Sequence, residues 1–190
     1  YDKTEVWKHP KMRSYVPMDQ LAPRSMRRPT APDNHYNHFN VVKTAKELSD
    51  IGVVANIGAH GQREGLGAHW ELWSINQGGM SNLETLKTAT INAANYIGAG
   101  KDIGSIENGK LADILVLDKN PLDDIQNSAT LRYTIANGRM YNSETMNEEG
   151  NEPKARKKFY WENNKYNAAF PWHEETESFM EHHCCDAIHN

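Results

Sequence analysis

The spacing of hydrophobic positions changes along this chain, and the changes mark where helices give way to strands. Between residues 41 and 51 the apolar positions follow helical spacing, and Gly52 ends that run. Residues 53–57 are almost continuously apolar, which is typical of a parallel strand buried on both faces. After a glycine-rich loop, the pattern predicts a second helix over residues 68–76.

A further helix is expected to begin after Ser81. Glu84 lies three residues on, which is the capping-box pattern, and Gly98 is a natural C-terminal stop. Between them, apolar and small residues step by three and four along one face. The residues of this face are Leu83, Leu86, Thr90, Ala93 and Ile97. The pattern therefore predicts one helix from residue 81 to residue 97.

The period then changes to two. Residues 111–117 form a strand-like run, and residues 131–136 alternate between apolar and more polar positions. Asn137-Gly138 is a two-residue hairpin signal, and a third strand-like run follows it. Residues 103–142 are therefore expected to form a small antiparallel sheet.

The two ends of the chain have no apolar period. Residues 1–39 contain five of the eight prolines, which favours an extended arm because proline fixes φ and lacks an N–H donor. Residues 143–190 are polar and are expected to form a tail. Four parts result: an arm over 1–39, a helix-rich part over 40–102, a sheet over 103–142 and a tail over 143–190.

Composition and charge exclude several classes of protein. The 190 residues carry 21 basic and 25 acidic side chains, a net charge of −4, which argues against a general nucleic-acid-binding protein. No run approaches the roughly 18 apolar residues of a membrane span. The two cysteines, Cys184 and Cys185, are adjacent, so no disulfide framework is available.

Three motifs in this order carry a resemblance to a known family. They are GVVANIGAHGQ at 52–62, LETLKTATINAANYIG at 83–98 and GSIENGKLADILVLD at 104–118. Together they resemble the C-terminal part of an amidohydrolase-superfamily enzyme, of the imidazolonepropionase-like branch that is often fused to a TolB-type β-propeller. The likeness covers about residues 40–142.

The resemblance implies an α/β fold: a (β/α)₈ barrel of the TIM type joined to a small β-sandwich. Residues 53–57 would be the last barrel strand, and residues 103–142 the C-terminal share of the sandwich, with the two arms at the ends. A whole barrel needs about 250 residues, so this chain is expected to be a C-terminal fragment. Another chain or segment would supply the remaining strands, in an oligomeric complex. The family also implies a periplasmic or secreted protein.

The resemblance also implies a chemistry, in which metal-activated water hydrolyses an amide or another C–N bond of a small-molecule or peptide substrate. The end of the last barrel strand usually carries an Asp that binds metal and acts as a base; here His60 stands at that position. A neutral imidazole can bind zinc or accept a proton. We therefore predict that His60 is both a metal ligand and the catalytic residue, with zinc as the expected divalent cofactor.

Four other residues are candidates for substrate binding. Gln62 and Arg63 lie on the glycine-rich loop, and a guanidinium suits a carboxylate. His69 and Glu71 follow on the next predicted helix. Positions two apart on a helix do not face each other, so one can face a pocket while the other orients a loop.

Two alternative functions remain open. The His-x-His metal motif of the first barrel strand is absent, and Asp is replaced by His60. Both features also suit a non-catalytic subunit, a pseudoenzyme that completes a barrel as a structural or interaction piece. A third hypothesis is a metal-binding module built from His182, His183 and the adjacent cysteines.

Overall fold

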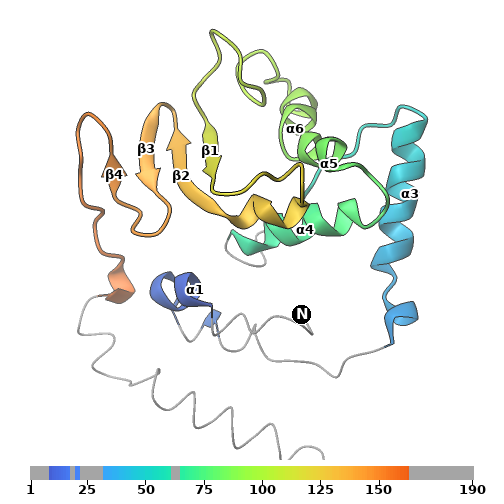
Figure 1. The fold of residues 1–190 in the computed structure, drawn as a ribbon, viewed down its shortest axis with the longest axis horizontal. Helices are drawn as coiled ribbons and strands as arrows, with labels where there is room; N and C mark the ends of the chain where they lie inside the picture. The colour runs from blue at the N-terminus through green and yellow to red at the C-terminus, as the bar shows by residue number, and fades with distance from the viewer. Residues whose placement is uncertain (1–8, 18–19, 22–31, 61–64, 163–190) are drawn as a thin grey trace, which may run out of the picture. The chain divides into compact units, whose positions relative to one another are not determined.

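The chain divides into two compact units in the computed structural model (Figure 1). The structure describes residues 9–17, 20–21, 32–60 and 65–162. One unit combines Tyr1–Ala31 with Lys157–Asn190, and the other is Pro32–Arg156. The predicted His/Cys metal module lies outside the described residues.

The first unit contains a helix where the sequence suggested an extended arm. Helix α1, Pro10–Tyr15, begins with its proline in the first turn, where the missing N–H would have had no partner in any case. The aromatic rings of Tyr15 and Phe159 pack edge to face, with their centroids 6.4 Å apart. Phe159 precedes the short 3₁₀ helix η4, Tyr160–Glu162. The prediction of an extended arm was therefore wrong over α1.

The second unit begins with helices. A 3₁₀ turn, η2 (Asp33–His35), precedes α3 (His38–Asp50); α4 (Leu66–Asn76), α5 (Asn82–Thr88) and α6 (Ile91–Tyr96) follow. In Figure 1, α3 stands at one side of this unit and the sheet lies at the other, with α4 below α5 and α6. The described part of the chain has no helix long and apolar enough to cross a bilayer.

The core of the helical part is small. Val42 of α3, Ile75 of α4 and Met80 form a buried cluster, against which Ala55 and Ile57 pack. The segment 53–57 therefore lies against the helices on one side.

Two helices replace the single helix predicted over 81–97. The capping box at Ser81 is confirmed: the Ser81 N–H donates to Glu84 Oε2 at 2.7 Å, and the Glu84 N–H donates to Ser81 Oγ at 3.3 Å. The helix then breaks between Thr88 and Ile91, where Thr90 has φ −129° and ψ −105°. The hydroxyls of Thr88 and Thr90 donate to the Thr85 and Leu86 carbonyls of α5, and such bonds compete with the helix.

The predicted antiparallel sheet is confirmed, in the order β1-β2-β3-β4. Its strands are β1 (Ile114–Leu117), β2 (Leu131–Ala136), β3 (Arg139–Asn142) and β4 (Glu148–Glu149). Ala136 pairs with Arg139, so Asn137-Gly138 is the two-residue hairpin loop that the sequence predicted.

The sheet extends further than the predicted boundary at residue 142. Tyr141 of β3 pairs with Glu148 of β4, and Glu148 also bridges to Lys154. Both guanidinium bonds from Arg139 end on the Glu148 carboxylate, at 2.7 and 2.6 Å, and they lower the pKa of that carboxyl. Residues 143–156 thus belong to the sheet unit.

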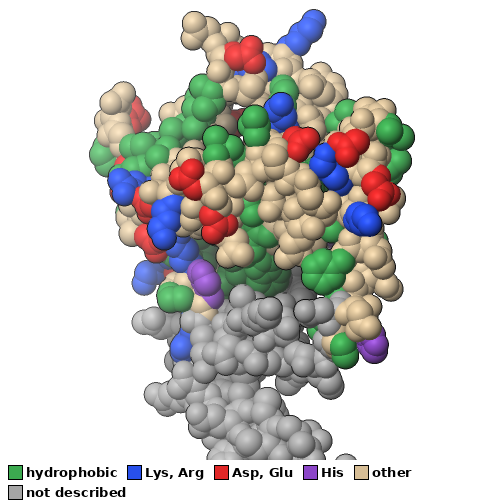
Figure 2. Space-filling view, turned by 45° about the vertical axis from the view of Figure 1, so that its right-hand side comes forward, with side chains coloured by type: hydrophobic (Ala, Val, Ile, Leu, Met, Phe, Trp, Pro, Cys, Tyr) green, Lys and Arg blue, Asp and Glu red, His purple; other side chains and the backbone are tan. Residues whose placement is uncertain are grey.

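The predicted strand over Val53–Ile57 is not a strand among the described residues, and this correction has a simple cause. A strand needs a ladder partner, and no described strand lies beside this segment. The backbone N–H groups of Val54, Ala55 and Asn56 bond no described residue. The side chains of Val53 and Val54 are 50% and 61% exposed. Apolar side chains likewise reach the surface between acidic and basic groups in Figure 2.

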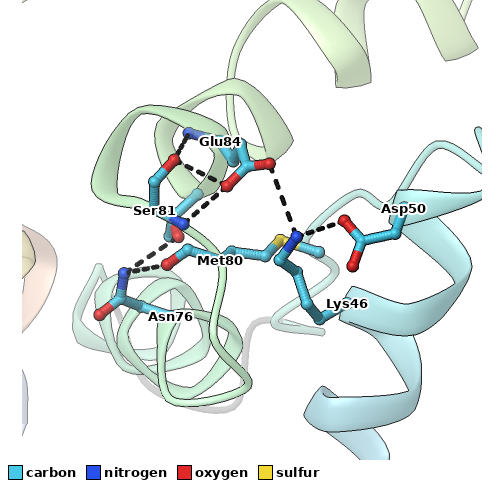
Figure 3. Close-up of polar contacts among 7 residues, drawn as sticks. Lys46, Asp50, Asn76, Met80, Ser81 and Glu84 are labelled. Atoms are coloured by element: carbon cyan, nitrogen blue, oxygen red, sulfur yellow. Dashed lines mark hydrogen bonds and ion pairs between the residues drawn. The ribbon is translucent and has the colours of Figure 1, made fainter.

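A polar cluster joins α3 to α5 (Figure 3). The Lys46 ammonium bonds the Asp50 carboxylate of its own helix and lies 3.8 Å from Glu84 Oε1 of α5. The bond to Asp50 raises the pKa of Lys46, and the Ser81 hydroxyl lowers the pKa of Glu84. Lys46 and Glu84 therefore stay charged at neutral pH, which keeps their attraction intact.

Candidate active site

The candidate catalytic residue lies just beyond the segment Val53–Ile57. His60 is exposed and follows Ile57 by three residues, at the carboxyl end of the predicted last barrel strand. Its φ is +55°, a left-handed backbone conformation that costs a non-glycine residue about 1–2 kcal/mol. Such conformations persist where the surroundings hold the chain in place.

Two consecutive backbone amides anchor the end of this segment to two different helices. The Ile57 N–H donates to the Thr88 carbonyl at the end of α5, at 3.3 Å. The Gly58 N–H donates to the Glu71 carboxylate of α4, at 2.9 Å. The backbone is thus fixed two residues before His60.

His69 lies on α4, as Glu71 does, but contacts a different neighbour. Its Nδ1 lies 3.1 Å from Ser128 Oγ, and the Trp73 indole N–H donates to the same oxygen at 2.9 Å. Ser128 is 5% exposed and lies in the 3₁₀ helix η3, Ile125–Ala129. Burial lowers the pKa of His69, so its ring is neutral at pH 7. His69 and Trp73 therefore join α4 to the connection between β1 and β2.

The C-terminal end of α4 is anchored as well. The Asn76 amide donates to the Met80 carbonyl at 2.9 Å, to Asn82 Oδ1 at 3.0 Å and to Thr85 Oγ1 at 3.2 Å (Figure 3 shows the first of these). Thr85 is fully buried. These bonds hold α4 against α5, so both ends of α4 have partners outside the helix.

The structure brings some of the predicted site residues together and leaves others apart. Glu71 contacts the segment that leads to His60, whereas His69 faces η3. Their different partners agree with the spacing of two on a helix. Gln62 and Arg63 lie outside the described residues. Substrate binding by these four residues stays a prediction.

The described residues supply little of a metal centre. No group of three or more His, Cys, Asp or Glu side chains among them has a geometry that would hold a metal ion. Zinc in a catalytic site takes three protein ligands and keeps one open position. The exposed His60 imidazole fits the role of one such ligand, and the others would have to come from elsewhere.

Comparison with known proteins decides the family. Residues 41–141 match the amidohydrolase family, over more than half of the chain. The chain belongs to the amidohydrolase family. Members of this family are generally metal-dependent.

The relatives match over short stretches. An imidazolonepropionase of Shouchella clausii is 46% identical over 61 residues, which are 32% of this chain and 12% of that protein. An ochratoxinase of Aspergillus niger is 38% identical over 55 residues, 28% of this chain and 12% of that protein. This amidohydrolase chain therefore spans a small part of the length of its relatives.

A solved structure supports the same family. The crystal structure of a Xaa-Pro dipeptidase with bound methionine in the active site is 26% identical, with a TM-score of 0.50. The similarity covers 55% of this chain and 25% of the dipeptidase. About half of this chain thus shares its fold with part of a larger enzyme.

Sequence patterns missed two residues that organise the site. Ser128 bonds Trp73 and His69 of α4 from 55 and 59 positions away, and no local motif marks a hydroxyl as the partner of a distant helix. Asn76 had a weak signal, since a polar residue near a helix end that faces the core needs partners.

Proposed function

We propose that this chain is the C-terminal part of a metal-dependent amidohydrolase that hydrolyses amide or other C–N bonds. Family membership supports this function. So does a 40-residue match at 52% identity, over 21% of this chain and 7% of the relative, to an N-substituted formamide deformylase of Arthrobacter pascens, whose name specifies an amide substrate. A small molecule or peptide with such a bond is the proposed substrate class.

The observation that carries the proposal is the open segment Val53–Ile57. The N–H groups of its three central residues bond no described residue, its valines are half exposed, and its other side packs on helices. This combination is what one strand of a (β/α)₈ barrel would have if its two neighbours came from elsewhere. Another chain, or sequence outside these 190 residues, would supply those neighbours and the remaining metal ligands in one complex.

The sheet fits the same proposal. Strand β1 is an edge of the four-stranded sheet, and Leu115 in its middle is 55% exposed. An exposed edge strand with an apolar side chain suits pairing with further strands. We propose that β1–β4 are the C-terminal share of a β-sandwich, and that the protein is periplasmic or secreted like the branch it resembles.

His60 is the residue of this chain proposed to reach the reacting atoms. An imidazole can offer one nitrogen to a divalent metal, zinc being the proposed ion, or accept a proton from the attacking water. The metal, when bound, supplies a lowered pKa for the water in its coordination sphere. The left-handed backbone at His60 sets the direction in which the ring leaves the chain.

The test uses the complete protein that contains these residues. Its metal content is measured by mass spectrometry, and hydrolysis is measured with N-formyl amines, N-acyl amino acids and Xaa-Pro dipeptides. We expect bound zinc, iron or manganese, turnover of one of these classes, and at least a hundredfold loss of kcat in His60→Ala. His35→Ala, a change at an exposed histidine of η2, is the matched control.

The contrary outcomes separate the two functions. Absence of bound metal together with absence of hydrolysis after metal addition would refute the proposal. A gain of activity in His60→Asp would instead identify a decayed enzyme, the pseudoenzyme alternative. A loss of activity in the same variant supports a working histidine.

A further inference from the structure

Glu71 differs from the other predicted site residues because its carboxylate accepts a hydrogen bond from the backbone. It accepts the Gly58 N–H at 2.9 Å across 13 residues of chain. An ionised carboxylate that accepts a backbone N–H makes a bond roughly twice as strong as a neutral pair does. This bond therefore has a large effect on where Gly58 lies.

The position of Gly58 matters because His60 follows two residues later. The Ile57 amide is already bound to the Thr88 carbonyl, on α5. With the Gly58 amide bound to α4, two consecutive peptide groups are held from two helices. Because the two bonds run to different helices, together they restrain both the position and the rotation of the backbone.

The helix that carries Glu71 is itself well held. His69 and Trp73 bond Ser128 on one side, and Asn76 bonds three partners at the C-terminal end. Leu72 of the same helix is 5% exposed. A carboxylate on such a helix moves little, so the bond from Gly58 to Glu71 fixes the backbone at Gly58 relative to α4.

We infer that Glu71 is a positioning residue, which holds the Gly58 amide so that His60 keeps its left-handed backbone and its aim toward the reacting atoms. The inference rests on the function proposed above, and it assigns Glu71 a role other than substrate binding. What the role requires of Glu71 is an acceptor oxygen. A glutamine keeps an acceptor oxygen in the same place, whereas an alanine has none.

The first experiment needs no substrate. Amide hydrogen exchange is measured in the complete protein for peptides covering residues 53–60, in wild type, Glu71→Ala and Glu71→Gln. A bond to a charged group corresponds to roughly 10–150-fold in an equilibrium constant, so we expect exchange at the Gly58 amide to rise at least tenfold in Glu71→Ala. Glu71→Gln should show a smaller rise. Glu47→Ala, at an exposed acidic residue of α3, is the matched control and should change nothing.

The second experiment separates positioning from substrate contact. With whichever N-formyl amine, N-acyl amino acid or Xaa-Pro dipeptide the complete protein hydrolyses, Glu71→Ala should lower kcat at least tenfold and leave KM within about twofold. Glu71→Gln should recover most of that loss, because it restores the acceptor. A carboxylate that binds substrate by its charge would instead raise KM in both variants alike.

The outcomes distinguish this inference from the proposed function. Equal exchange in wild type and Glu71→Ala would overturn the positioning role, as would equal rates in Glu71→Gln and Glu71→Ala. If no substrate is hydrolysed, the exchange measurement decides alone. If the protein hydrolyses none of these substrates but exchange at Gly58 is slower in wild type than in Glu71→Ala, the positioning role is supported and the hydrolase function is not.

Discussion

Gly104 lies where the connection from α6 to β1 passes close to α6. Its φ is +90°, and a Cβ at this position would lie 2.6 Å from Ala94 Cβ and 3.0 Å from Ile91 Cα. Ala94 is 3% exposed, so it has little room to move away. Gly109, in the same connection, has φ +93° and nothing within 4 Å of such a Cβ. The pair therefore separates backbone strain from steric overlap.

Alanine at either glycine carries the cost of a left-handed residue, about 1–2 kcal/mol. The smaller conformational entropy of the unfolded chain offsets about 0.4–1 kcal/mol of that cost. Gly109→Ala should therefore destabilise by about 0–2 kcal/mol. Gly104→Ala adds an overpacking cost of about 1–3 kcal/mol, because Ala94 and Ile91 must shift.

The assay is amide hydrogen exchange over residues 90–113 in the complete protein. The overpacking cost corresponds to exchange faster in Gly104→Ala than in Gly109→Ala by roughly 5–150-fold. Equal exchange in the two variants would refute the reasoning. It would mean that Ala94 and Ile91 of α6 move aside without a measurable loss of free energy of unfolding.

Three further outcomes are expected. Ser128→Ala should destabilise the protein by about 1–3 kcal/mol, measured as a urea midpoint, because the Trp73 N–H loses its acceptor in a part-buried site; an effect below 0.5 kcal/mol would contradict this. His69 has a pKa below its ordinary value of 6.5, so the unfolded chain takes up the proton first as the pH falls. Stability should therefore be complete above about pH 6.5 and decline below it, and His69→Gln should lose less stability than wild type between pH 7 and pH 5; parallel profiles would count against burial as the cause. Ser81→Ala should cost about 1 kcal/mol through the lost cap, and Ser81→Asp, which restores an acceptor, should recover most of it in thermal unfolding.

Local signals predicted local structure well. Ser81 and Glu84 lie three residues apart, and Asn137-Gly138 joins two strands that are neighbours in sequence, so each element depends on contacts that a short window contains. The family was predicted from short motifs within residues 52–118, and this prediction is confirmed.

The errors over residues 53–57 and at His69 arose because structure there depends on distant partners, whereas the error over residues 81–97 has a local cause. Residues 53–57 have the composition of a buried strand, but pairing requires neighbours that the described residues do not include. The helix predicted over 81–97 broke because hydroxyls at Thr88 and Thr90 bond nearby carbonyls, and hydrophobic spacing does not register that competition. The partner of His69 was equally out of reach, since Ser128 is 59 residues away.

Helix α4 uses several directions around its axis at once. His69 and Trp73 reach one neighbour, Glu71 another and Asn76 a third. Each residue of an α-helix is turned by about 100° from the one before. A single inserted or deleted residue in the middle of α4 would therefore turn Asn76 away from its partners while Glu71 kept its own, or the reverse. The number of residues in α4 is therefore fixed by the neighbours that its side chains contact.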